Sequence, residues 1–313
     1  IGLAAPGAFQ ARGFQATSVG GVIGAAAAAA QIMGLDHVKT ISAIGIAGGQ
    51  ASGSLAFLAE GAMSKALNPG WAARTGIEAA RLAAAGMTCP ASVLESGFGV
   101  MAGFAGDASG LDPALATLGE AWLLPDAAFK LYPCCHYIHP FLEAVEQTMA
   151  AGLCADDLVT LTAFVPPPAA PLICEPWARR QAPISGYDGK WGLAYAMALM
   201  LVDGYVDVDS FAASPRPEVL AVARRMAWAP MQDHGFPSRF AARVTGQGAT
   251  GSFDVAIDQV RGAPDRPVDA GVIRKKFARN AKRRFDGAHV ARLEAALLDL
   301  SAAPDTRSLA ALL

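Results

Sequence analysis

The chain has 313 residues, of which 53% are hydrophobic and 17% charged, and its formal net charge is -2. This near-neutral balance excludes the broad basic face that nucleic-acid binding requires, and the length suggests about two domains. The cysteine count is odd, and Cys134 and Cys135 are adjacent, which favours a reducing, cytoplasmic compartment over a disulfide framework.

The apolar runs are short. The longest, residues 22–30, falls far below the ~20 residues that a membrane-spanning helix needs, so we expect no membrane partner. The chain begins at Ile1, and we expect the N-terminal part of a longer protein to be missing.

The first third of the chain has the pattern of closely packed helices. Small residues recur at helical spacing, and no alternating β-branched run occurs before residue 155. Gly34 and Asp36 mark the end of one helix and the start of the next. The expected helices cover residues 20–33, 37–49, 56–63, 69–85 and 113–122.

The middle of the chain is mixed. Residues 159–165 predict a strand that stops at three prolines, and an Arg- and Pro-rich loop follows to about residue 189. Helices are expected at 191–202 and 217–226. Residues 241–245 and 252–257 predict two strands joined through a glycine-rich turn.

The tail returns to helices, at residues 269–285, 289–300 and 306–313. We therefore predict a mainly α fold with an α+β domain. In this plan a discontinuous all-helical domain begins with residues 1–125, a smaller α+β lid covers 126–264, and C-terminal helices at 265–313 return to the helical domain.

Lys65 lies in a long run of Ala, Gly and Leu with few charges in the preceding fifty residues. An ammonium in apolar surroundings is costly unless it meets an anion. A protein carboxylate, Glu60 or Glu78, could supply that anion, and so could the carboxylate of a substrate. The residues alone favour the structural pairing.

Six segments, in order, resemble the MmgE/PrpD family of lyases and isomerases. The resemblance spans the whole chain and implies a helical domain plus an α+β lid, a homodimer, no cofactor and an active site between the domains. Family chains extend further at the N-terminus, where an Asp and a His belong to the site. The segments are Gly13–Thr17 with Gly24 and the alanine run, Ala43–Gly48, Ser64–Gly70, Phe129–Cys135 with His139-Pro140, Tyr187–Trp191 and Lys276–Ala281.

The resemblance implies that Lys65 and Lys190 bind carboxylates of the substrate. Lys130 lies in a well-matched segment, where a role in the site and a structural ion pair are equally supported. His139 is a weak local candidate for the general base, and a residue in the preceding part of the protein is the stronger one. Arg179 and the adjacent arginine are expected to be solvated loop charges.

Gln15, Asn68 and Trp191 stand where relatives often carry histidine. None of these side chains titrates near neutral pH, which argues against the dehydratase and decarboxylase reactions of the family. We expect Gln15 and Asn68 to orient substrate oxygens. The alternative is that they bridge backbone groups, with Trp191 in the core.

The segment from Cys134 to His139 contains two cysteines and two histidines, which are residue types that bind metal ions. Vicinal cysteines do not readily ligate one tetrahedral ion, and no second cysteine pair is present, so we predict no bound metal. A metal or redox sensor at Cys134 and Cys135 remains a weaker alternative.

The resemblance implies a cofactor-independent lyase, similar to 2-methylcitrate dehydratase, that acts on a small di- or tricarboxylate. The chemistry would be proton abstraction from a carbon next to a carboxylate that cations hold. One alternative is an isomerase or epimerase of a small dicarboxylate. Another is a non-catalytic member that binds a carboxylate ligand or serves as a structural dimer.

Overall fold

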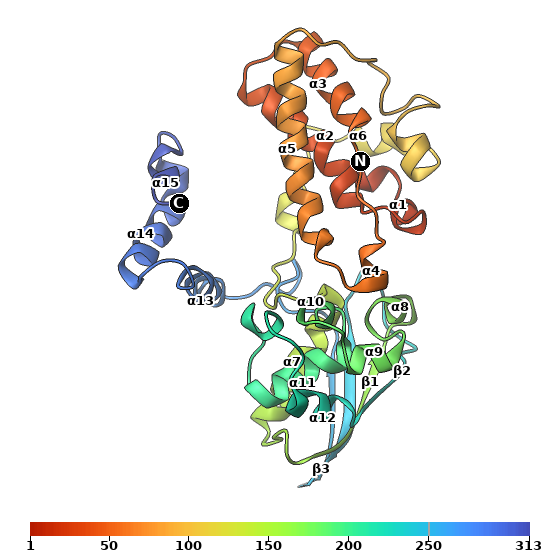
Figure 1. Cartoon of the computed structure of the whole chain (residues 1–313), viewed down its shortest axis with the longest axis vertical. Coiled ribbons are helices and arrows are strands. Elements are labelled where there is room, and N and C mark those ends of the chain that lie inside the picture. The colour runs from red at the N-terminus through yellow and green to blue at the C-terminus, as the bar shows by residue number, and fades with distance from the viewer. Residues whose placement is uncertain (250) are drawn as a thin grey trace. The chain divides into compact units, whose positions relative to one another are not determined.

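The computed structural model describes residues 1–249 and 251–313 and divides the chain into two compact units, Ile1–Leu123 and Leu124–Leu313 (Figure 1). The first unit is helical, and the second holds one small mixed sheet, so the fold class predicted from sequence is confirmed. The lid boundary at residue 264 and the return of the C-terminal helices to the first unit stay predictions.

The first unit is a helical bundle packed through small side chains. Helix α2 packs against α3 and α5, and alanines dominate the core between them. A Cβ atom added at Gly76 would lie 2.5 Å from the Cβ of Ala25, so glycine is what allows α5 to approach α2 so closely. The helices are α1 (Ala8–Ala11), α2 (Ala16–Ile32), α3 (His37–Gly49), α4 (Phe57–Glu60), α5 (Ser64–Ala84) and α6 (Leu111–Leu115).

Helices α5 and α6 differ most from the sequence prediction in this unit. Helix α5 begins at Ser64, five residues early, and carries Pro69 inside it, near its start. The helix expected at 113–122 is only α6, because Leu118 and Trp122 are 80% and 76% exposed and give a longer helix no apolar face to bury.

The second unit contains a four-stranded sheet in the order β2-β1-β3-β4. Strand β1 (Leu158–Val165) pairs parallel with β2 (Met226–Pro230) and antiparallel with β3 (Ala242–Gly248), which pairs antiparallel with β4 (Gly251–Ile257). The predicted β1 strand and β3–β4 hairpin are confirmed, although the turn residue Thr250 lies outside the described residues. The sequence reading missed β2, whose first residue it placed at the end of a helix.

Helices cover this sheet. Helix α11 is buried from Leu193 to Leu201 and packs against α7 and α12, while α7 contacts β3 and β4. The stretch expected to be a loop up to residue 189 contains three short helices. The helices are α7 (His139–Ala150), α8 (Ala170–Ile173), α9 (Trp177–Gln181), α10 (Gly186–Gly189), α11 (Leu193–Asp203), α12 (Pro217–Ala223), α13 (Ala270–Ala281), α14 (Gly287–Leu298) and α15 (Arg307–Ala310).

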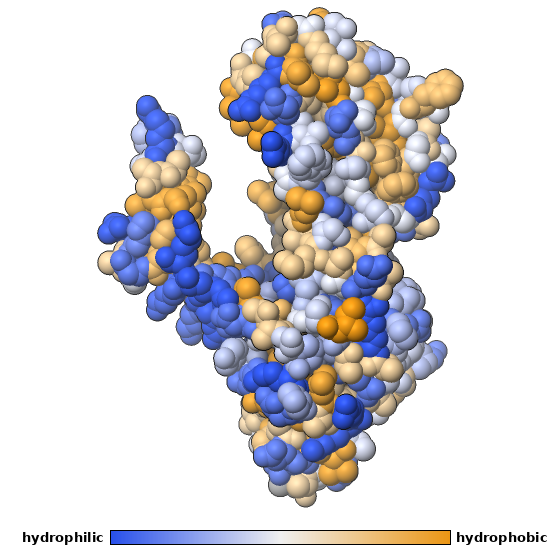
Figure 2. Space-filling view, in the orientation of Figure 1, coloured by the Kyte–Doolittle hydropathy of each residue, from blue (hydrophilic) through white to orange (hydrophobic). Residues whose placement is uncertain are grey.

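The surface of α13 is mainly hydrophilic in the space-filling view (Figure 2). Within the described part of the chain, no helix combines the length and the apolar character that crossing a bilayer requires.

A buried carboxylate anchors the loop that ends in Lys190. Asp188 is 1% exposed, and its two oxygens accept hydrogen bonds from Nε and Nη2 of Arg179, each at 3.0 Å. Nη1 of Arg180 lies 3.8 Å from the same carboxylate, and Arg180 is itself 5% exposed. The expectation that both arginines are solvated is therefore wrong for Arg180. A buried carboxylate requires cationic partners, and it draws this arginine inside.

We predict that Asp188→Ala destabilises the protein by about 3–5 kcal/mol, because it leaves a buried guanidinium without its counter-charge. Denaturant unfolding of the variant and the unchanged chain measures the loss. Asp254→Ala is the matched control, since Asp254 forms an exposed bidentate pair with Arg243 on the β3–β4 hairpin and should have little effect. Equal effects of the two variants would contradict the anchoring role.

Candidate functional site

The site residues predicted from sequence fall into two groups. Gln15, Lys65 and Asn68 lie in the first unit, and Lys130, His139 and Lys190 lie in the second. The structure brings residues together within each group.

Gln15 and Asn68 contact each other directly. Nδ2 of Asn68 donates a hydrogen bond of 2.8 Å to Oε1 of Gln15. Gln15 occupies the N-cap position of α2, but its side chain makes no capping bond. Its backbone N–H donates to the Gly53 carbonyl at 2.8 Å. The amide side chain of Gln15 is thus committed to Asn68 and not to its own helix.

A close backbone approach fixes this contact. A Cβ atom at Gly53 would lie 2.5 Å from Cβ of Ser18, and Gly53 has a φ of +123°, which side chains rarely allow. Oγ of Ser18 in turn donates to the Asn68 carbonyl at 3.3 Å. The start of α2, the Gly53 loop and the start of α5 therefore form one connected cluster.

Lys65 lies on the first turn of α5, three residues before Asn68, and is half-buried. Residues at this spacing are neighbours on one face of a helix, so Lys65 and Asn68 share a side of α5. Pro69 has no N–H to donate to the Lys65 carbonyl four residues earlier. Binding of a substrate carboxylate at Lys65 stays a prediction.

In the second unit, a backbone hydrogen bond joins the segments that carry Lys130 and Lys190. The N–H of Cys135 donates to the Lys190 carbonyl at 2.8 Å. Nζ of Lys130 donates to the Cys134 carbonyl at 3.2 Å, so this side chain folds back over its own segment. Lys190 follows α10, two residues after the anchored Asp188.

Lys130, Lys190 and Lys276 form a cluster in the second unit whose ammonium groups have little negative charge around them. Burial lowers the pKa of Lys190, and the charge of Lys130 lowers it further. Burial and Lys130 likewise lower the pKa of Lys276, whose Nζ donates to the Lys130 carbonyl. Among the described residues, none of the three lysines forms an ion pair with a carboxylate.

At Lys190, two aromatic rings stand partly in place of a carboxylate. Its Nζ lies 5.0 Å from the ring centroid of Tyr187 and 5.8 Å from that of Phe211. Such contacts stabilise a cation without neutralising it. Lys190 therefore keeps a positive charge available to an anion.

His139 is the first residue of α7 and is 2% exposed. Its ring packs edge-on against Tyr132 and His136, with centroids 5.1 and 4.8 Å apart, and within residues 1–249 and 251–313 neither buried ring nitrogen has a partner in good hydrogen-bond geometry. Burial, followed by the charges of His136 and Lys130, lowers the pKa of His139 to about 2, although the nearby Cys134 backbone opposes the shift. These features disfavour His139 as a base near neutral pH, and its catalytic role stays a prediction.

The two adjacent cysteines are buried thiols. Burial, followed by the neighbouring Cys135, raises the pKa of Cys134. Within residues 1–249 and 251–313, no three His, Cys, Asp or Glu side chains gather in an arrangement that could hold a metal ion. Low-pKa, exposed thiols are the reactive ones, and Cys134 is the opposite.

Sequence reasoning missed a polar network beside this cluster. The Tyr132 hydroxyl donates to Oε1 of Glu146 at 2.6 Å, and Nη2 of Arg261 donates to Oε2 of Glu146 at 2.8 Å and to the Tyr132 oxygen at 3.1 Å. Tyr132 and Lys276 both lie in segments that the family resemblance had marked. Arg261 lies beyond β4 with no local signal, because only the fold brings it to α7.

Chemically, the second-unit cluster suits a ligand with several carboxylates. Like charges held together by the fold raise the local positive potential, and each oxyanion placed there relieves mutual repulsion as well as forming an ion pair. The Gln15–Asn68 pair offers neutral donors and acceptors and moves no proton.

Comparisons with known proteins agree with these features. The models of the MmgE/PrpD N-terminal domain and the MmgE/PrpD C-terminal domain match residues 1–110 and 132–301. The cis-aconitate decarboxylase-like protein oryM of Aspergillus oryzae is 27% identical over 318 residues, which cover 96% of this chain and 65% of that protein.

Cis-aconitate decarboxylases of Homo sapiens and Aspergillus terreus are 31% and 28% identical over 202 and 228 residues. The aligned parts cover 63% and 68% of this chain but 40% and 46% of those proteins, so the chain spans about half the length of the curated relatives it matches. Because the two domain models match most of the chain in the right order, this chain belongs to the MmgE/PrpD family.

Proposed function

We propose that the chain acts in a lyase for a small tricarboxylate, with cis-aconitate as the first substrate to test. One observation carries the proposal: among the described residues, Lys130, Lys190 and Lys276 lie close together with no carboxylate paired to them, and Lys190 and Lys276 are partly buried. The names of the relatives supply the substrate, and their reaction favours decarboxylation over the dehydration expected from sequence.

The lysines would act through charge. In decarboxylation the bond between carbon and one carboxylate breaks, CO₂ leaves, and the electron pair stays on carbon until a proton replaces the lost group. A cation about 4 Å from a remaining carboxylate contributes roughly 4 kcal/mol at an effective dielectric of 20, before desolvation is subtracted. Cations already in place favour the transition state because negative charge develops toward them.

The proton step needs a group other than those named so far. Gln15 and Asn68 orient oxygens by hydrogen bonding but cannot exchange protons near neutral pH. His139 stays neutral and enclosed, and we assign it a positioning role, in which its ring packs beneath the Lys130 segment through Tyr132 and His136.

A second candidate is a non-catalytic carboxylate-binding protein. The three positions where relatives often carry histidine hold Gln15, Asn68 and Trp191, and none titrates in the range where histidine works. Isomerisation of a dicarboxylate is a third outcome. Product analysis after incubation with cis-aconitate, alongside calorimetry for binding, separates binding without turnover from lyase activity.

We predict that Lys65→Met and Lys190→Met each weaken binding of cis-aconitate about tenfold to a hundredfold, because each removes one charged hydrogen bond to a carboxylate. Turnover should fall with the lost charge. Titration calorimetry and CO₂ release measure the two effects. Arg74→Met is the matched control for Lys65, because Arg74 is an exposed cation on the same helix, α5. Lys282→Met is the matched control for Lys190, because Lys282 is an exposed cation of the second unit, at the C-terminal end of α13.

Lys190→Met also tests whether the charged Lys190 side chain lowers the stability of the folded protein. Burial lowers its pKa, so the folded state resists its charge, and methionine should leave the thermal midpoint unchanged or higher. Full affinity in both lysine variants would rule out the proposed site. A loss of affinity together with a large loss of stability would show instead that Lys190 is structural.

We predict that His139→Phe makes the protein less sensitive to acid. The unfolded histidine takes a proton below about pH 6.5, whereas the folded one has a pKa of about 2, so its contribution to stability declines as pH falls below 6.5. Between pH 6.5 and 4.5 the unchanged chain should lose roughly 2–3 kcal/mol more than the variant. Urea unfolding across this range measures the difference, and identical acid profiles would contradict the buried, neutral state.

A further inference from the structure

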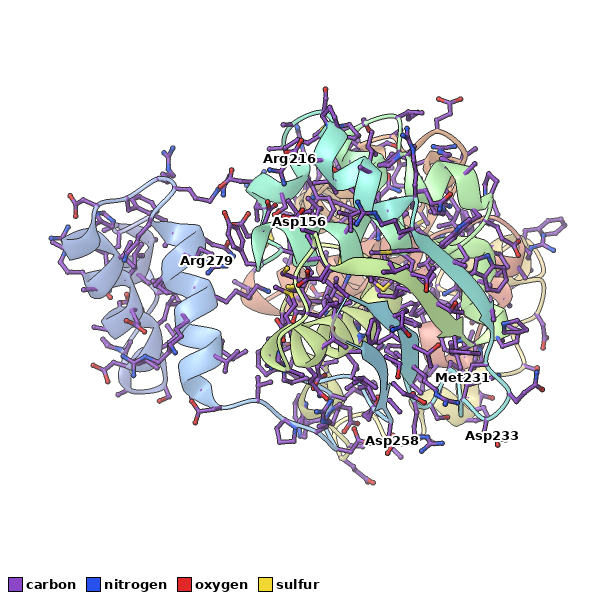
Figure 3. All side chains as sticks on the ribbon, turned by 90° about the horizontal axis from the view of Figure 1, so that it is seen from below. Asp156, Arg216, Met231, Asp233, Asp258 and Arg279 are labelled. Atoms are coloured by element: carbon purple, nitrogen blue, oxygen red, sulfur yellow. The ribbon has the colours of Figure 1, made fainter. Side chains whose placement is uncertain are left out.

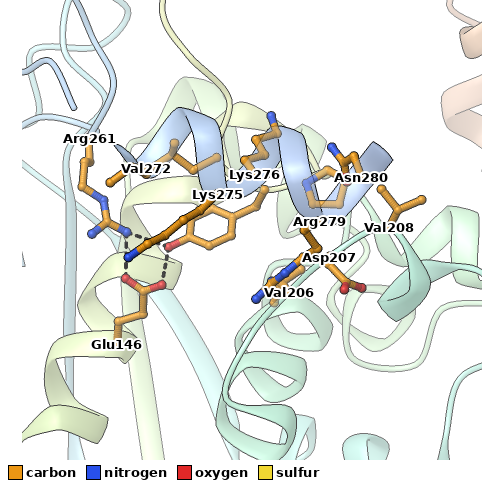
Figure 4. Close-up of a pocket in the computed structure, with 13 residues that line it drawn as sticks. Glu146, Val206, Asp207, Val208, Arg261, Val272, Lys275, Lys276, Arg279 and Asn280 are labelled. Carbon is orange, nitrogen blue, oxygen red and sulfur yellow. Dashed lines mark hydrogen bonds and ion pairs between the residues drawn. The ribbon is translucent and has the colours of Figure 1, made fainter. Parts of the chain in front are cut away.

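The second unit contains a cavity of about 230 Å³ beside α13 (Figure 4). One wall is a single helix face, because its residues follow the spacing i, i+3, i+4, i+7 and i+8. The opposite wall comes from four other parts of the unit: residues 131–133, Glu146 of α7, residues 206–208, and Arg261. The α13 residues are Val272, Lys275, Lys276, Arg279 and Asn280.

The acids of this cavity are already engaged. Glu146 accepts from both Tyr132 and Arg261, and this pairing balances the Arg261 charge. Oδ1 of Asp207 accepts from the backbone N–H groups of Asp209 and Ser210, at 2.9 and 3.2 Å, and so holds its own loop.

The cations of α13 therefore exceed the negative charge that faces them. Lys275, Lys276 and Arg279 face Asp207 alone once Glu146 is paired with Arg261, and none of the three forms an ion pair in the described part of the chain. The guanidinium of Arg279 stacks 5.3 Å from the Tyr205 ring, which fixes its position but leaves its charge. Seen from below, Arg279 lies on the side of α13 that faces the sheet-bearing part of its unit (Figure 3).

We propose that this cavity binds a small oxyanion carrying two or more negative charges, held by Lys275 and Arg279 with Lys276 beside them. Guanidinium and ammonium groups together suit phosphate or a small polycarboxylate, because the planar fork pairs two oxygens and the ammonium groups act as point charges. The cavity is smaller than the pockets that take drug-sized ligands, which favours a small occupant over a nucleotide.

This site differs from the cluster proposed to bind the substrate. Lys276 is common to both, but Lys130 and Lys190 do not line the cavity, and Lys275 and Arg279 do not belong to the substrate cluster. The two proposals can therefore fail separately.

The test is titration calorimetry of the full chain with inorganic phosphate and, separately, with citrate, at constant ionic strength. We expect saturable binding that Lys275→Gln and Arg279→Gln each weaken about tenfold. Lys282→Gln, at the exposed C-terminal end of the same helix, should bind as the unchanged chain does. Tighter binding of phosphate or of citrate identifies which oxyanion the cavity prefers.

A variant that is expected to bind more tightly controls for loss of binding through misfolding. Asp207→Asn keeps an oxygen to accept from Asp209 and Ser210 but removes the negative charge facing α13, so it should tighten binding. Lys190→Met should leave phosphate binding unchanged. The proposal is overturned if neither oxyanion binds saturably, or if the α13 variants and Lys282→Gln behave alike.

Discussion

In the second unit, Lys190 and Lys276 both lie within the electrostatic reach of Lys130, and none of the three pairs with a carboxylate among the described residues. Lys190 and Lys276 both lose basicity to burial and to the charge of Lys130, and each is held by something other than an acid: two aromatic rings or a backbone carbonyl. Such crowding costs folding free energy. A chain selected only for stability would place a carboxylate there, as this one does at Asp188 for Arg179 and Arg180. The contrast between a satisfied cationic cluster and an unsatisfied one, close in sequence, is the strongest physical argument that the latter receives an external anion.

Local patterns predicted most of the fold, and contacts between distant segments account for the misses. Strand β1 and the β3–β4 hairpin alternate and have turn residues beside them, so the sequence alone reveals them. Strand β2 exists because β1 offers it a parallel partner, from Leu161 opposite Met226 to Val165 opposite Pro230. Its composition resembles the helix before it, and Pro230 is tolerated because the strand lies at the sheet edge. The burial of Arg180 was equally invisible, since the carboxylate that draws it inward lies eight residues later and is itself buried by the fold.

The candidate site also divides into residues that local patterns reveal and contacts that only the fold creates. The residue types at Gln15, Lys65 and Asn68 could be selected from their segments, but the bond between the two amides could not, because it joins α2 to α5 across fifty-three positions. Gln15 and Asn68 satisfy each other, so they form a pre-set pair of amide groups whose remaining donors and acceptors have fixed directions. Such a pair suits a site that orients oxygens and leaves proton transfer to another group.

The two anion sites proposed for the second unit share one residue. Lys276 lines the α13 cavity and also donates to the backbone of Lys130, so its charge is felt in both places. An oxyanion in the cavity would reduce the positive potential at Lys276 and ease its repulsion of Lys130. The same negative charge would make the neighbourhood of Lys130 less attractive to a substrate carboxylate. These effects oppose each other, and distance decides between them: the first acts through a direct lysine contact, whereas the second weakens with every ångström between the two anions and is screened by salt. Occupation of the cavity should therefore fix the position of the Lys130 segment more than it lowers the affinity for substrate.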